Sequence, residues 1–265
     1  MPTLQNALNE LDRMEVISAN DSLLHRIDAR AKLTVTVVFL VSMLSLPLDD
    51  ITDLLPFFIY PILLTSLADI SLRFISVRSL IVLPFIIFIG IFNPLLQRNI
   101  LFYIGDVPIT EGWVSFISIL LRGILSVQAA LLLILTTGFY KLCRGMERMG
   151  LPSLFSTQLL FVYRYIFVLI QESIIMSRAR DSRSFGKKGF SIKTWGVLTG
   201  QLMIRTFERA ERIHNAMISR GFTGNIKGDL KHTWNYKDTF YLIGWSLFFI
   251  LLRFLMPVSY LVSFL

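Results

Sequence analysis

The 265-residue sequence has one cysteine, Cys143, and three histidines, His25, His214 and His232. One cysteine cannot form a disulfide within the chain, and histidines so far apart in sequence do not indicate a metal site. Charged residues make up only 17% of the chain, whereas a soluble domain carries about 25%. No G-x-x-x-x-G-K-[ST] phosphate-binding loop is present, so we expect no ATPase site and no bound cofactor in this chain.

Apolar sequence is abundant. Hydrophobic residues make up 54% of the chain, 22 residues are Phe, and the mean hydropathy is +0.63. A membrane-spanning helix needs about 20 mostly apolar residues, and the polar first 30 residues do not resemble a signal peptide. We therefore predict an all-α, polytopic membrane helix bundle with about five spans. The predicted spans are residues 31–46, 51–70, 80–96, 112–140 and 241–256.

The basic residues indicate the orientation. Lys and Arg are concentrated in every second connection: four lie in residues 1–32 and seventeen in residues 141–237, but none lies in the turn after the first span. This is the positive-inside pattern. We predict a cytoplasmic segment 1–30, spans within 31–140, a cytoplasmic region 141–237, and a last span with an outside tail in 238–265. The expected location is a prokaryotic cell membrane, with the amino terminus inside and the carboxyl terminus outside.

Two features allow more than one interpretation. Leu154–Met176 is apolar enough for a sixth span, but it contains Arg164 and Glu172, and charges at membrane depth cost roughly 2.5–3.5 kcal/mol each. We favour a helix at the interface or packed under the bundle. Arg122 lies within the fourth span; we favour a structural arginine bound to backbone carbonyls or a carboxylate over one that contacts a substrate.

Region 141–237 has a net charge of +11 but is rich in Leu, Ile, Phe and Met. The pattern predicts one helix from about Ser153 to Arg183 and a second over about Ile192–Ser219, followed by Gly221. Glu208 and Arg212 have the i,i+4 spacing of a helical ion pair. The predicted apolar stripe of the second helix consists of Leu202, Phe207, Ala210, Ile213, Ala216 and Met217.

Both predicted helices end in a similar tripeptide, Ser182-Arg183-Ser184 in the first and Ser219-Arg220-Gly221 in the second. A cation near a helix carboxyl end is favoured by the helix dipole alone. Two copies in one cytoplasmic region favour a second role, because a guanidinium at a helix tip can pair with carboxylates of a partner. We predict that both tripeptides contact a soluble partner.

At these residues the sequence resembles the transmembrane T component (EcfT) of energy-coupling factor (ECF) transporters, most of all the cobalt/nickel-type CbiQ family. Leu24–Leu33 resembles the family's L-D-P-R-x-K-L opening, with Ala29 where proline is usual. Phe92–Pro94, Tyr163–Leu169 and Arg205–Arg212 also resemble family segments. The two tripeptides resemble the family's Ala-Arg-Gly motifs, with serine in place of alanine in both and Ser184 in place of glycine in the first.

The resemblance implies an energy-coupling subunit of an ABC-type importer, with cobalt or nickel as the expected substrate. Its two helix tips would bind two cytosolic ABC-type ATPases, which use the ATP, and the chain would also hold a membrane S component that binds the substrate. No nucleic acid is expected as a partner. The residues expected to support the coupling helices are Arg164, Arg205, Glu208, Arg209, Glu211 and Arg212.

Other functions remain open at this point. The chain could be the T component of a vitamin-type importer, since those systems share the arginine motifs, or a permease that binds its own solute. A membrane-bound enzyme is disfavoured because no acid/base or nucleophile constellation is evident. The basic region could also contact anionic lipid head groups.

Overall fold

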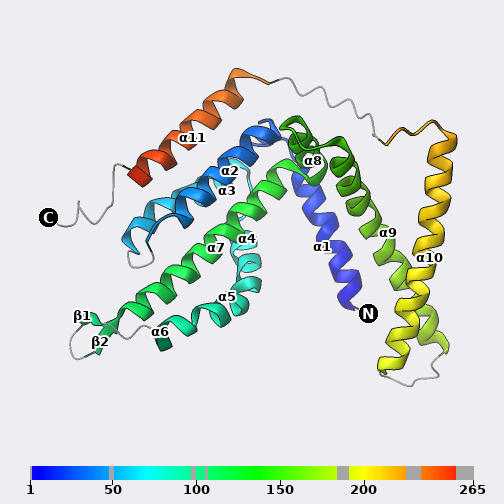
Figure 1. The fold of residues 1–265 in the computed structure, drawn as a ribbon, viewed down its shortest axis with the longest axis horizontal. Helices are drawn as coiled ribbons and strands as arrows, with labels where there is room; N and C mark the ends of the chain where they lie inside the picture. Colours follow the sequence, from blue (N-terminus) through cyan, green and yellow to red (C-terminus); the bar gives the residue numbers. More distant parts are fainter. Residues whose placement is uncertain are drawn as a thin grey trace. The chain divides into compact units, whose positions relative to one another are not determined.

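The computed structural model describes residues 2–47, 51–96, 100–104, 107–183, 191–224 and 234–254. It is a helical protein, as predicted, with one small β-hairpin that the sequence analysis did not predict (Figure 1). The chain divides into two compact units, Met1–Val16 with Met146–Lys231, and Ile17–Gly145 with His232–Leu265. The first holds the two helices predicted to contact a soluble partner and is named the coupling unit; the second holds most of the predicted spans and is named the membrane unit.

Helices α2 and α11 of the membrane unit pack against each other, and α2 also packs against α7. An aromatic cluster fills the interior between α2, α3 and α11: Phe39 stacks on Tyr60 with ring centroids 4.7 Å apart, and Phe249 lies 5.3 Å from each of them. Such aromatic pairs add to the stability of packed interiors. The principal helices are α2 (Ala29–Leu44), α3 (Ile59–Leu67), α7 (Glu111–Thr137), α8 (Phe139–Arg148) and α11 (Tyr236–Phe254).

The predicted third span has the wrong start. Instead of a connection before residue 80, the helical stretch Leu72–Pro94 already includes Arg73 and Arg78. The guanidinium carbon of Arg78 lies 3.6 Å from the ring centre of Phe74, a cation–π contact that accommodates the charge on a helix. Pro84 lies at the first positions of an α-helix, where proline is tolerated. This stretch comprises α4 (Leu72–Ser79), the 3₁₀ turn η2 (Leu80–Val82), α5 (Leu83–Gly90) and α6 (Phe92–Leu96).

The second predicted span begins as a 3₁₀ helix, η1 (Thr52–Phe58), which contains Pro56 and leads into α3. The hairpin consists of β1 (Ile100–Ile104) and β2 (Val107–Thr110), antiparallel, with Ile100 opposite Thr110 and Ile104 opposite Val107. The fourth predicted span is α7, which ends at Gly138 with φ +76°. Glycine adopts this left-handed conformation without the strain that a side chain would cause.

In the part of the chain that the structure describes, three helical stretches are long and apolar enough to cross a membrane: Leu72–Pro94, Glu111–Thr137 and Ser153–Arg183. The first overlaps the third predicted span but starts earlier, and the second overlaps the fourth. The third contains the segment Leu154–Met176, so length and composition do not decide between a span and an interfacial helix. The five-span arrangement and the orientation of the termini remain predictions.

Candidate functional site: two basic helices of the coupling unit

The coupling unit contains all but the last two residues of α1 (Pro2–Ser18) and two long helices, α9 (Ser153–Arg183) and α10 (Ile192–Ser219). The bounds of α9 and α10 agree with the predicted helices, including the start after Pro152. Serine 191 caps α10, because its hydroxyl accepts a hydrogen bond from the backbone N–H of Thr194.

Helices α9 and α10 pack side by side and run antiparallel (Figure 1). Phe161 near the start of α9 contacts Phe222 just after α10, and Glu172 further along α9 pairs with Arg205 in the middle of α10. A helix of this length extends about 40 Å. The ends that carry Arg183 and Arg220 therefore lie at opposite ends of the helical pair, and both arginines are exposed.

A complete capping motif ends α10. The backbone N–H of Phe222 donates to Met217 O at 3.0 Å, and that of Gly221 donates to Ile218 O at 2.9 Å, with Gly221 at φ +77°. This is the Schellman arrangement, in which a left-handed glycine satisfies the last helical carbonyls. The Phe222 ring packs against Phe161 of α9 at a centroid distance of 6.4 Å. The backbone at Arg220 is thus held from both sides while its side chain stays exposed.

The serines of the two tripeptides are satisfied within their own helices. The Ser182 hydroxyl donates to Arg178 O at 3.1 Å, and the Ser219 hydroxyl donates to Asn215 O at 2.9 Å. When a serine in the last turn donates its hydroxyl to the carbonyl four residues earlier, this donor is satisfied within the helix and needs no other partner. This explains how serine can replace the alanine of the family motif. Ser184 lies outside the described residues.

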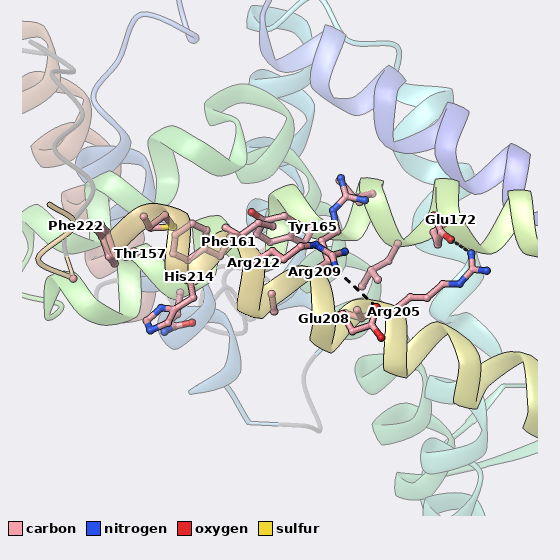
Figure 2. Close-up of a pocket in the computed structure, with 18 of the residues that line it drawn as sticks. Thr157, Phe161, Tyr165, Glu172, Arg205, Glu208, Arg209, Arg212, His214 and Phe222 are labelled. Atoms are coloured by element: carbon pink, nitrogen blue, oxygen red, sulfur yellow. Dashed lines mark hydrogen bonds and ion pairs between the residues drawn. The ribbon is translucent and has the colours of Figure 1, made fainter. Parts of the chain in front are cut away.

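A cavity of about 640 Å³ lies between α9 and α10 (Figure 2). Its walls are apolar and aromatic, with Phe161, Tyr165, Val168 and Leu169 from α9, and a set of charged side chains lies along it. The charged residues that line it are Glu172, Arg205, Glu208, Arg209 and Arg212.

Four of the six predicted support residues line this cavity: Arg205, Glu208, Arg209 and Arg212. The ion pair Arg205–Glu172 measures 2.5 Å and links the two helices, and the predicted pair Glu208–Arg212 is present at 3.8 Å. Arg164 and Glu211 are exposed and do not line the cavity.

The predicted apolar stripe of α10 is wrong at three of its six positions, because Phe207, Ala210 and Ala216 are exposed. Phe207 is 64% exposed, and Thr206 is partly buried in its place. The partly buried positions follow spacings of four and seven residues and include Leu202, Ile213 and Met217. Sequence spacing showed a face of the helix, but it did not show which face α9 would cover.

Arg122 lies outside this site, in the membrane unit. Its guanidinium donates to the backbone carbonyls of Leu46 and Pro47, directly after α2, and its side chain is buried. Arg253 donates to Ser45 O at 3.2 Å and to Ser45 Oγ at 3.1 Å. Carbonyls at and just beyond a helix carboxyl end lack partners within the helix, and the two arginines donate to successive residues there, Arg253 to Ser45 and Arg122 to Leu46 and Pro47. Backbone carbonyls are among the partners that the sequence analysis expected for a structural arginine at position 122, and that role stays a prediction.

Sequence reasoning missed a buried polar group in the membrane unit. It includes Asp28, Lys32 and Asp238, all at most 3% exposed. Asp28 and Lys32 lie in Leu24–Leu33, the segment that resembles the L-D-P-R-x-K-L opening, and this resemblance was a signal that could have drawn attention to them. Nothing in the sequence connected that segment to Asp238, since 210 residues separate Asp28 from Asp238.

Residues 20–231 match the family model of CbiQ, described as cobalt transport protein. The chain belongs to the CbiQ family. An uncharacterised protein of Methanocaldococcus jannaschii is 32% identical over 250 residues, covering 89% of this chain and 84% of that protein. The energy-coupling factor transporter transmembrane protein EcfT of Thermosediminibacter oceani is 27% identical over 220 residues, covering 77% of this chain and 82% of its own.

The EcfT protein of Bacillus subtilis is 26% identical over 252 residues, covering 88% of this CbiQ-family chain and 94% of its own. These similarities extend over most of both chains. Together with the family match and the apolar helices, they make this CbiQ-family chain a transmembrane component of an ECF-type transporter, which is not an enzyme family.

Proposed function

We propose that this chain couples two cytosolic ABC-type ATPases to a membrane S component in an importer for cobalt or nickel ions. The observation that carries the proposal is the position of Arg183 and Arg220, exposed at opposite ends of one antiparallel helical pair. Two separate basic tips fit two separate ATPase subunits. An exposed guanidinium at a helix end can form paired hydrogen bonds with carboxylates in a groove of each subunit.

The cavity and ion pairs between α9 and α10 support the mechanical part of the proposal. Because Glu172 and Arg205 join the helices at their middle and Phe161 and Phe222 join them at one end, the pair can transmit a movement of one tip to the other helix. ATP binding and hydrolysis by the ATPases would move the tips, and the chain would pass this movement to the S component.

The packing of α9 on α10 also supports a cytoplasmic or interfacial place for Leu154–Met176. This segment lines one side of the cavity, and Arg205, Arg209 and Arg212 of α10 line the other. Placing these three charges in the hydrocarbon of a membrane would be costly. We propose that both helices remain on the cytoplasmic side with the amino terminus, and that the carboxyl terminus lies outside.

Cobalt is proposed from the description of the family and from a further relative. A protein of Methanocorpusculum labreanum named as a putative fused cobalt transport protein CbiMQ is 34% identical over 93 residues, which cover 35% of this chain and 16% of that protein. We propose that this chain itself binds neither the ion nor ATP. Among the residues that the structure describes, no group of three or more His, Cys, Asp or Glu could hold a metal ion.

The test is charge reversal at both tips. In membranes that contain the ATPases and the S component, Arg183→Glu with Arg220→Glu should abolish copurification of the ATPases, while membrane insertion of the chain is unchanged. Arg26→Glu is the matched control, because Arg26 is exposed and its ion pair with Asp21 is exposed as well. Continued copurification and Co²⁺ uptake by the double variant would contradict the proposal.

A further inference from the structure

The first residues of α2 contact three other parts of the membrane unit. Asp28 caps the helix, since its carboxylate accepts the backbone N–H of Arg30 at 2.9 Å, and it also pairs with the Arg30 guanidinium at 3.1 Å. Asp28 and Lys32 are almost fully buried. A helix start that carries this many buried charges needs partners from elsewhere in the fold.

The first partner is the start of α11, where the chain returns from the coupling unit. One carboxylate oxygen of Asp238 accepts the backbone N–H of Asp28 at 2.9 Å, and the other accepts the backbone N–H of Asn235 at 2.9 Å. Asp238 is 1% exposed. The Arg30 guanidinium carbon also lies 4.9 Å from the ring centre of Trp234, within the range of a cation–π contact.

The other partners are α7 and α8, which lead towards the coupling unit. The Lys32 ammonium donates to Thr136 O at 2.7 Å, one residue before the end of α7. A Cβ atom at Gly145 of α8 would lie 2.9 Å from the Cβ of Ala29, closer than two carbons can approach without a shift. Glycine at this position therefore allows α8 to contact the start of α2 directly.

The chain crosses between the two units three times, after Val16, after Gly145 and before His232. Helix α8, which carries the second of these crossings, contacts Ala29, and α11, which follows the third along the chain, is hydrogen-bonded to Asp28. Asp28 and Asp238 together balance the charges of Arg30 and Lys32. Removing one member would leave an uncompensated buried charge or an unpaired backbone group.

We infer that Asp28, Arg30, Lys32 and Asp238 form an anchor that fixes, inside the membrane unit, the helices α8 and α11 that border the coupling unit along the chain. They are positioning residues, because they transmit the movement of the coupling helices and touch neither ATP nor substrate. The inference rests on the proposed coupling function. It assigns to the segment that resembles L-D-P-R-x-K-L a role in efficiency, namely how much transport each hydrolysed ATP drives.

The test uses the full complex with its ATPases and S component, reconstituted in vesicles, with radioactive Co²⁺ as the transported ion. Asp238→Asn keeps the size of the side chain but replaces one acceptor oxygen with a donor that faces a backbone N–H. We expect assembly and ATP hydrolysis to continue, while Co²⁺ taken up per ATP hydrolysed falls roughly fivefold to thirtyfold. Asp21→Asn, on the exposed ion pair with Arg26, is the matched control and should leave this ratio unchanged.

Arg30→Lys is the second variant, since it keeps the charge but loses the forked hydrogen bonds and the stacking on Trp234. Its side chain is only partly buried, so it should fold even if Asp238→Asn does not, and it should lower the same ratio. A purely structural role would reduce the amount of complex and leave uptake per ATP unchanged, and that result would overturn the anchor. Failure of the wild-type complex to assemble or to take up Co²⁺ would instead contradict the proposed function.

Discussion

The guanidinium of Arg205 on α10 lies 2.5 Å from the carboxylate of Glu172 on α9 and joins the two helices at their middle. The two side chains are 53% and 26% exposed, so water screens their attraction. We expect Arg205→Ala to lower the free energy of unfolding by less than about 1 kcal/mol. The measurement is thermal unfolding of the full chain in detergent. The double variant Arg205→Glu with Glu172→Arg, which keeps the ion pair with its charges exchanged, should be nearly as stable as the original chain. A loss of several kcal/mol would show a role beyond this ion pair.

Gly221→Ala should weaken binding of the ATPases. At φ +77° an alanine is strained by about 1 kcal/mol or more, and relief of the strain would displace the neighbouring Arg220. Titration of the purified chain with the ATPases gives the change in affinity, expected to be about fivefold or more. Gly200→Ala is the control, since Gly200 lies within α10 with no heavy atom near its Cβ position, and this change should not weaken binding. An unchanged affinity for Gly221→Ala would show that the tip is not shaped by this glycine.

Arg122→Gln should destabilise the membrane unit. Removing the guanidinium leaves the carbonyls of Leu46 and Pro47 with fewer donors, the first hydrogen bond being buried and the second partly buried, at a cost of about 1–3 kcal/mol. The melting temperature in detergent should fall. Arg253→Gln should cost less, because its hydrogen bonds are exposed to solvent. Loss of transport by Arg122→Gln at unchanged stability would favour the alternative role as a substrate contact.

Cys143 should react very slowly with thiol reagents. Its side chain is fully buried, and burial raises the pKa of the Cys143 thiol to about 11. Near pH 8 the reactive thiolate is therefore roughly a hundredfold rarer than in an ordinary cysteine. Maleimide labelling followed by mass spectrometry measures this. Because Cys143 itself reacts slowly, a cysteine introduced by Arg220→Cys can be labelled selectively. Maleimide should label it from the cytoplasmic side alone, and labelling from outside would contradict the proposed orientation.

Stability should fall in mild acid because of His25. Its Nδ1 lies 2.7 Å from Ser22 Oγ and its Nε2 lies 3.1 Å from Ile17 O, an arrangement that suits a neutral ring. Burial, followed by the charge of Lys32, lowers the pKa of His25 below its usual value of 6.5. The unfolded chain then binds the proton more readily than the folded chain. The contribution of His25 to the free energy of unfolding is therefore complete above about pH 6.5 and decreases as the pH falls below that value. Melting temperatures from pH 7.5 to 5.5 measure the loss, and His25→Gln should reduce this dependence.

The helical limits of the coupling unit could be predicted because their signals are local. Ser153 after Pro152, the cap Ser191 and the left-handed Gly221 each act within one or two turns of the chain. The i,i+4 pair Glu208–Arg212 is local in the same sense. The beginning of the third span was wrong because the cost of Arg73 and Arg78 on a helix depends on what their side chains contact.

The sequence alone determined that this chain is helical and apolar, that it has a basic region with two long helices, and that an arginine ends each of them. Composition and short-range spacing suffice for these properties, since they depend on neighbours within a few residues. Only the tertiary structure decided that α10 turns Phe207 away from α9, that Arg205 meets Glu172, and that Asp238 holds Asp28. Those contacts join residues 33 to 210 positions apart and exist because burial selects which face and which charge each helix presents to the others.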